Sequence, residues 1–264
     1  MSTRIDVLTG DNALIGGFII NGGTTPKKVL LRGIGPSLAT GSAPLTGVLA
    51  DPTLELHKPD GTIISNNDWR STQEAEIIAT GAAPKSDLES AIIATLPPIN
   101  PSVPGSGVYT AILSGHNGGT GIALVEIYDL DNAAAAPSYL ANLSSRGFVQ
   151  PVDGVMIGGF IVGASTEATQ IFIRALGPSL ADEQVANPLQ NPVLELHNGN
   201  GALIVSNDNW ADTDKDAIIA TGLAPKNAAE SAMIASLPAG NYTAVLSGAG
   251  NTSGVALIEV YSLH

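Results

Sequence analysis

The stretch LLRGIGPSL begins at Leu30, and a close copy, FIRALGPSL, begins at Phe172. Each copy carries an arginine within an apolar run, Arg32 in the first and Arg174 in the second. Two further phrases recur in the same order: PTLELHKPDGTII at Pro52 returns as PVLELHNGNGALI at Pro192, and YTAILSG at Tyr109 returns as YTAVLSG at Tyr242. Self-similarity on this scale indicates a duplicated domain.

The repeat also sets the expected domain boundaries. We predict a first module over residues 1–131, a linker over 132–143 and a second module over 144–264. The copies differ most where the first has the Pro-rich segment PPINPSVPGSGVY from Pro97 and the second has only PAGNY from Pro238. This composition indicates a loop insertion in the first module.

Composition limits the classes of function. The chain has a formal net charge of −13 and a pI of about 4.4. Nucleic acids and anionic membranes attract clustered Lys and Arg, so neither is an expected partner. The chain has no cysteine, no signal peptide after Met1 and no apolar run of about 18 residues that would span a bilayer. Low charge with abundant Thr, Asn, Ser and Gly favours an extracellular or cell-surface bacterial protein, of which this chain would be a fragment.

Strand and turn patterns predict the fold class. Short apolar runs are separated by Gly-rich turns, and Pro-Asp-Gly at 59–61 has the chemistry of a hairpin turn. Ser71 and Glu74 have the spacing of a helix capping box, and Gly81 suits a helix C-terminus. With about seven strands per module, we expect an all-β protein of two tandem antiparallel β-sandwiches, jelly-roll-like, each with one short helix.

Two charged residues in each module interrupt apolar rows on expected strands. Burying an unpaired charge is costly, so such residues are normally paired. We therefore predict structural ion pairs between Arg32 and Glu126 and between Arg174 and Glu259. The alternative partners are Glu55 and Glu195. The other interpretation is that these strand faces are solvated and the charges are unpaired.

A polar loop precedes each expected helix, as NNDW in the first module and NDNW in the second. Ca²⁺ binds several oxygens from carboxylates, amides and backbone carbonyls. The candidate ligands are Asn66, Asn67 and Asp68 in the first module and Asn207, Asp208 and Asn209 in the second. Turn hydrogen bonds made by the same side chains are the simpler interpretation.

The two tryptophans, Trp69 and Trp210, end these loops and are the candidate ligand-binding residues. An exposed tryptophan stacks on sugar rings, whereas a lone tryptophan more often covers the edge of a core. No nucleophile elbow, metalloprotease motif or phosphate-binding loop occurs in the sequence, so we do not expect an enzyme.

The segments PTLELHKPDGTIISNNDW, ESAIIATLP, GVYTAILSG and GIALVEIYDL resemble the tandem modules of large secreted bacterial surface proteins. More distantly, they and LPAGNYTAVLSG at Leu237 are similar to the bacterial pre-peptidase C-terminal domain. That resemblance implies a jelly-roll-like sandwich without catalysis and a role in secretion, adhesion or spacing. It also implies calcium ligands at Asp51 and Asp68, with Asn191 and Asp208 at the matching positions of the second module.

Together these features predict a non-catalytic, extracellular structural or adhesive tandem module. It would contact neighbouring repeat modules or assemble with itself into filaments, and calcium would be its one cofactor. The alternative function is a carbohydrate-binding module with one polysaccharide site per repeat.

Overall fold

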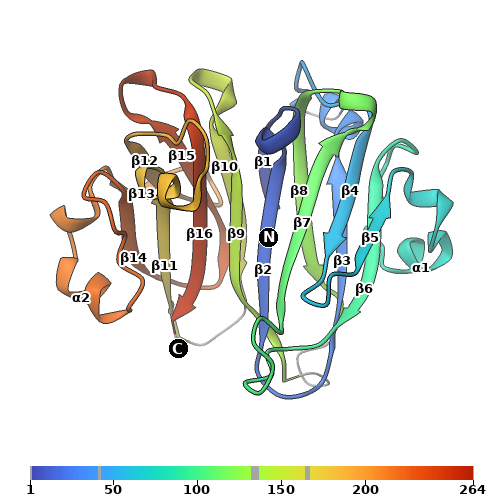
Figure 1. Cartoon of the computed structure of the whole chain (residues 1–264), viewed down its shortest axis with the longest axis horizontal. Coiled ribbons are helices and arrows are strands. Elements are labelled where there is room, and N and C mark those ends of the chain that lie inside the picture. The colour runs from blue at the N-terminus through green and yellow to red at the C-terminus, as the bar shows by residue number, and fades with distance from the viewer. Residues whose placement is uncertain (1, 41–42, 132–136, 164–166, 264) are drawn as a thin grey trace. The chain divides into compact units, whose positions relative to one another are not determined.

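The computed structural model describes residues 2–40, 43–131, 137–163 and 167–263. The described chain is almost entirely β-structure with two short α-helices, so the predicted fold class, an antiparallel β-sandwich, is confirmed. It folds as two compact units that divide between Leu143 and Ser144. We call them the N-terminal and C-terminal units and assign β9, which crosses that boundary, to the C-terminal unit. Figure 1 shows their strands and helices.

The N-terminal unit places four strands in each of two sheets. One sheet has the order β1-β8-β3-β6, and the other has the order β2-β7-β4-β5. The strands are β1 (Ser2–Val7), β2 (Leu14–Asn21), β3 (Lys27–Ile34), β4 (Pro52–His57), β5 (Ile63–Asn66), β6 (Ser90–Leu96), β7 (Val108–Gly115) and β8 (Gly121–Asp129).

The C-terminal unit repeats this plan. Its sheets have the orders β9-β16-β11-β14 and β10-β15-β12-β13. The strands are β9 (Tyr139–Val149), β10 (Met156–Val162), β11 (Thr169–Leu176), β12 (Pro192–Asn198), β13 (Leu203–Asn207), β14 (Ser231–Leu237), β15 (Gly240–Gly248) and β16 (Gly254–Leu263).

Each unit therefore has eight strands where the sequence pattern predicts about seven. The additional strand is the lead-in, β1 in one unit and β9 in the other. Its residues alternate between buried and partly exposed, but the buried positions of β1 include Thr3, so the apolar period is weak in the sequence. Residues 132–136 of the expected linker lie outside the described residues, and residues 139–143 already belong to β9.

The alternation of side chains explains most of the burial pattern. Along β4 the residues alternate between buried and partly exposed, as expected for a strand with one face on the sandwich core. Strand β3 differs because Leu30 and Leu31, on opposite faces, are both fully buried. Leu30 packs in a second apolar cluster with Trp69, Ile77 and Ile93, so β3 needs apolar residues on both faces.

Ile77 is the buried residue of helix α1 (Glu74–Ala79), and its counterpart in α2 (Lys215–Ala220) is Ile218. Ile218 packs with Phe172 and Ala232 of the C-terminal unit. Each helix thus covers the outer face of the sheet that contains the arginine strand, beside β6 or β14 (Figure 1).

The predicted start of the helix is wrong. The residue before α1 is Gln73, in the left-handed region with φ 57°, and it makes no side-chain cap. Ser71 instead donates from Oγ to the carbonyl of Asp68, so it closes the preceding turn. The helix ends as expected, because Gly81 has φ 71° and donates from its N–H to the carbonyl of Ile78.

The hairpin turn at 59–61 lies between β4 and β5, as predicted. Gly61 has φ 82°, and the N–H of Thr62 donates to Asp60 Oδ1 at 2.9 Å. These backbone and side-chain hydrogen bonds from Thr62 lower the pKa of Asp60.

Candidate functional site

The arginine in the first copy of the repeated phrase joins three elements of the N-terminal unit. Arg32 on β3 lies directly opposite Glu126 on β8 in the strand register. Its Nε donates to Glu126 Oε2 at 2.9 Å, and a second guanidinium nitrogen also contacts that oxygen. Nη1 donates to the carbonyl of Ala82 at 2.6 Å, and Nη2 donates to the hydroxyl of Tyr128 at 3.0 Å. The loop after α1 is thereby fixed to the sheet.

The C-terminal unit builds the same network. Arg174 on β11 faces Glu259 on β16, with 2.5 Å between Nε and Oε2. Its Nη1 donates to the carbonyl of Leu223 at 2.6 Å, and Nη2 lies 3.5 Å from the hydroxyl of Tyr261. That hydroxyl donates to Glu259 Oε1 at 2.9 Å, so both oxygens of the carboxylate have donors.

A tyrosine completes the hydrogen-bond network in each unit, and its surroundings raise the pKa of its phenol. Each lies under its arginine, with the guanidinium carbon 5.0 Å from the ring centre of Tyr128 and 5.7 Å from that of Tyr261. Burial is the main cause that raises the pKa of both phenols, and the neighbouring glutamate is the second cause. Phenols that stay protonated can keep donating to the carboxylates, so the network is stable over the physiological pH range.

The alternative partners have other contacts. Glu55 Oε2 lies 2.8 Å from Nε2 of His57, and Glu195 Oε2 lies 2.9 Å from Nε2 of His197. Each pair is two residues apart on one strand and therefore on one face. Among the residues that the structure describes, the ion pairs of these two glutamates are with these histidines and not with an arginine.

The GPS part of the repeated phrase is explained by a glutamate that the sequence analysis missed. Glu89 is fully buried, and its Oε1 accepts hydrogen bonds from the backbone N–H groups of Gly35 at 3.1 Å and Ser37 at 2.8 Å. Its Oε2 accepts from Ser37 Oγ at 2.7 Å and from the N–H of Ser86 at 3.2 Å. A Cβ atom on Gly35 would lie 2.1 Å from the carbonyl oxygen of Leu49, so no other residue fits there.

Glu230 repeats this arrangement in the C-terminal unit. Its Oε1 accepts from the N–H groups of Gly177 at 3.0 Å and Ser179 at 2.9 Å and from Ser179 Oγ at 2.5 Å, and its Oε2 accepts from the N–H of Asn227 at 3.2 Å. The available sequence signal was the Glu-Ser-Ala triplet at residues 89–91 and 230–232. A carboxylate with four donors satisfies the backbone of two loops at once.

The proposed calcium ligands of the N-terminal unit are mostly engaged in the loop itself. Asn66 donates to the carbonyl of Asp68 at 3.1 Å and accepts the N–H of Ala91 at 2.9 Å. Asn67 Oδ1 accepts the hydroxyl of Thr53 at 2.6 Å. Asn66 therefore makes the kind of turn hydrogen bond that the simpler interpretation expects, whereas Asn67 is bound by Thr53 of β4, outside the loop.

In the C-terminal unit Asn207 donates to the carbonyl of Asn209 at 3.0 Å and accepts the N–H of Ala232 at 3.0 Å. Asn209 donates to Asp212 Oδ2 at 3.3 Å. With the amide nitrogen of Asn191 turned toward acceptors, it donates to Asp208 Oδ1 at 3.1 Å and to the carbonyl of Ala229 at 2.9 Å. The C-terminal unit therefore has a hydrogen-bond donor at the position where the resemblance implies a calcium ligand.

Asp51 and Asp68 are the carboxylates at the matching positions of the N-terminal unit. Asp51 Oδ1 is buried and, within the described residues, has no hydrogen-bond partner. Within the same part of the chain, no three His, Cys, Asp or Glu side chains gather as a metal site. Two carboxylates are fewer than the roughly six to eight oxygens that Ca²⁺ takes, so backbone carbonyls and water would have to complete its shell.

The two tryptophans differ in accessibility. Trp69 is only 2% exposed, its Nε1 donates to the carbonyl of Ser86 at 3.0 Å, and the guanidinium of Arg70 lies 4.1 Å from its ring centre. A sugar ring cannot stack on it, so the ligand-binding prediction is wrong for Trp69. Trp210 is partly exposed, and its buried Nε1 has no partner among the described residues. Ala211 stands where the N-terminal unit has Arg70, so no guanidinium from that position covers the ring of Trp210.

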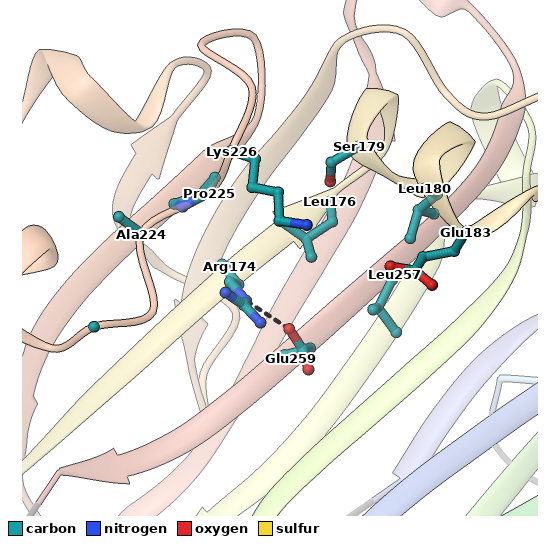
Figure 2. Close-up of a pocket in the computed structure, with 11 residues that line it drawn as sticks. Arg174, Leu176, Ser179, Leu180, Glu183, Ala224, Pro225, Lys226, Leu257 and Glu259 are labelled. Atoms are coloured by element: carbon teal, nitrogen blue, oxygen red, sulfur yellow. Dashed lines mark hydrogen bonds and ion pairs between the residues drawn. The ribbon is translucent and has the colours of Figure 1, made fainter.

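A pocket of about 340 Å³ opens beside the Arg174–Glu259 pair (Figure 2). Its apolar lining includes Leu176, Leu180 and Leu257. Its remaining charged side chains are Lys226 and Glu183. No recognisable sequence motif marks these two residues: Glu183 ends the 3-10 helix Pro178–Glu183, and Lys226 lies in a loop.

The comparisons with known proteins give little further information. No protein-family model matches the chain, and no curated protein matches it. A solved structure, the crystal structure of the infectious bursal disease virus VP2 subviral particle, is similar at 9% sequence identity and a TM-score of 0.19 over 99% of this chain and 71% of that one. A likeness this weak carries no argument about function. None of the helices in the described ranges is long and apolar enough to cross a bilayer.

Proposed function

We propose that the protein is a non-catalytic structural or adhesive tandem module of a bacterial surface or extracellular protein. The observation that carries this proposal is the use made of the repeated polar residues. Four polar side chains recur in both units: the arginine, the two glutamates and the first asparagine of the polar loop. They form hydrogen bonds to backbone groups of their own unit and to one another. These repeated polar residues thus support the fold.

Support for assembly with further copies comes from the edge strands. β5 and β13 each end the order of a sheet. Ile63 on β5 and Leu203 on β13 are both 54% exposed. An exposed apolar edge strand offers backbone hydrogen bonds and apolar contacts to a strand of another copy.

The test is assembly at rising protein concentration, followed by sedimentation velocity and electron microscopy. The variant Ile63→Lys with Leu203→Lys places a charge on each edge strand and is expected to abolish assembly. The matched control is Ile78→Lys with Ile219→Lys, because those helix residues are both 51% exposed. A wild type that stays monomeric, or edge variants that assemble as well as the controls, would contradict the proposal.

Calcium enters this proposal only at Asp51 and Asp68 of the N-terminal unit. A cation bound only by the folded state raises the melting temperature. We expect Ca²⁺ to raise the midpoint over that in chelator for the wild type but not for Asp51→Asn, which copies Asn191 of the other unit. Equal midpoints for the wild type in Ca²⁺ and chelator would remove calcium from the account.

Carbohydrate binding is the second candidate function, and the partly exposed ring of Trp210 favours it. On a glycan array, Trp210→Ala should then lose binding, whereas Trp69→Ala tests only the effect of core damage. Binding that survives Trp210→Ala would exclude this ring as the sugar platform.

A further inference from the structure

We propose that the pocket of the C-terminal unit binds a uronic acid residue of a polysaccharide, with Lys226 as the ligand for its carboxylate. This inference goes beyond the structural role, and neither depends on the other. It starts from the groups in the pocket that have no other function in the structure.

Most polar groups of the pocket are already satisfied. Arg174 is engaged by Glu259, Leu223 and Tyr261, and Ser179 is engaged by Glu230. Across the described part of the chain, Lys226 and Glu183 have no hydrogen-bond or ion-pair partner. The pocket therefore presents one free cation and one free anion, which enter it from opposite sides in Figure 2.

Lys226 is presented by a loop that is fixed on both sides. Arg174 binds the carbonyl of Leu223 before it, and Glu230 binds the N–H of Asn227 after it. Pro225, directly before Lys226, is buried. A backbone held at these points limits the conformational entropy that a ligand must remove on binding.

The same loop carries a lysine in the N-terminal unit. Lys85 follows Ala-Pro as Lys226 does, with Arg32 bound to the carbonyl of Ala82 and Glu89 bound to the N–H of Ser86. Lys85 also lacks a partner among the described residues. Both lysines are exposed, so the fixed loop leaves their ammonium groups accessible to a ligand.

The lining selects the chemical class of the ligand. A carboxylate suits the ammonium of Lys226, and charge-assisted hydrogen bonds of this kind are the strong ones. Glu183 accepts hydrogen bonds, which suits the hydroxyl groups of a sugar, while Leu176, Leu180 and Leu257 suit the C–H face of its ring. An acidic peptide is the competing ligand, because its N–H groups can also donate to Glu183, but it lacks the ring face that the three leucines suit.

The test is a titration of the full chain with D-glucuronic acid, followed by ¹⁵N NMR of the pocket amides. We expect saturable shifts that glucose, which lacks the carboxylate, does not produce. Lys226→Gln should weaken binding about 10-fold or more, in keeping with the loss of a charge-assisted contact. Lys215→Gln, which removes an exposed lysine of α2 outside the pocket, should leave it unchanged.

Three results would overturn the inference. They are the absence of shifts at millimolar glucuronic acid, equal binding by Lys226→Gln and wild type, and equal shifts with N-acetyl-aspartate amide, which would point to an acidic peptide. A Glu183→Gln variant that keeps the carboxylate contact but binds glucuronic acid less tightly would support the assigned role of the hydroxyl groups. None of these results bears on assembly through the edge strands.

Discussion

The N-terminal and C-terminal units place the same polar network on the same strands, yet they differ at the positions around it. Both keep the arginine, its glutamate and tyrosine, and the buried glutamate under the GPS turn. They differ in the residue that lies beside the edge strand, in the loop after the lead-in strand and in the residue that packs on the tryptophan ring. The shared residues bind backbone groups of loops far away in sequence, so a substitution there would leave buried polar groups unpaired.

The buried glutamates give the largest expected effect. Glu230→Ala removes the acceptor for four donors inside the C-terminal unit, and we expect that unit to lose about 3–5 kcal/mol of unfolding free energy. Glu89→Ala should cost the N-terminal unit a similar amount. Hydrogen exchange of each unit's strands measures both losses, and Glu183→Ala is the surface control. A loss in one unit only would show that the two networks are not equivalent.

The next effect tests a difference at the sheet edge. Gln73 acts as an extra strand residue beside β6, because its amide donates to the carbonyl of Ile93 at 2.9 Å and accepts the N–H of Ile93 at 3.0 Å. Asp214 occupies the same left-handed position and makes no side-chain cap, and the hydrogen bonds of the described residues include none between it and Ile234. Gln73→Ala should destabilise the N-terminal unit by about 1–3 kcal/mol.

The reverse substitution sharpens the same comparison. Asp214→Gln should stabilise the C-terminal unit by about 1 kcal/mol and slow the exchange of the Ile234 amide. Denaturant unfolding with exchange at this amide is the measurement. An unchanged exchange rate in Asp214→Gln would mean that the β14 edge cannot accept the amide as β6 does.

A smaller effect concerns backbone strain in the lead-in loops. Gly10 has φ 62°, and Val152 has φ 61° with 80% of its surface exposed. The left-handed region costs a residue with a Cβ about 1–2 kcal/mol, and a β-branched side chain is especially rare there. Val152→Gly should therefore stabilise the C-terminal unit by about 1 kcal/mol in thermal unfolding, and Gly10→Val should destabilise the N-terminal unit. A destabilised Val152→Gly would contradict the strain assignment.

The smallest effect is a loss of stability in alkali. The pKa of Tyr261 is raised in the fold, so its contribution is fully present below the ordinary phenol value of about 10 and is lost as the pH rises toward the folded value. One pH unit above that ordinary value, the loss is about 1 kcal/mol or less after screening by solvent. Tyr261→Phe should reduce the slope of the C-terminal unit's unfolding free energy between pH 9 and pH 11, values chosen to lie about one unit either side of it. The pKa of Tyr128 is also raised, so a slope remains in the N-terminal unit. An unchanged slope of the C-terminal unit in Tyr261→Phe would place the titration elsewhere.

Much of the fold follows from local sequence patterns. Alternating apolar residues locate the strands, the Pro-Asp-Gly turn fixes the first hairpin, and charges inside apolar rows direct attention to Arg32 and Glu126. The contacts of Glu89 could not be inferred in this way, because its partners are backbone N–H groups of a distant loop, and any residue has such groups. The start of α1 was missed for a related reason, since the left-handed Gln73 is held by a contact with β6 and not by a local cap.

The most direct test of the central claim is the state of the two arginines in solution. If each arginine lies inside its apolar run to bind a glutamate and fix a loop, the Nε–H signals of Arg32 and Arg174 in ¹⁵N spectra will exchange slowly with water. Arg32→Met will remove one signal and Arg174→Met the other, because each Nε donates to its glutamate. Nε–H groups that exchange with water as fast as those of a free arginine would contradict the account.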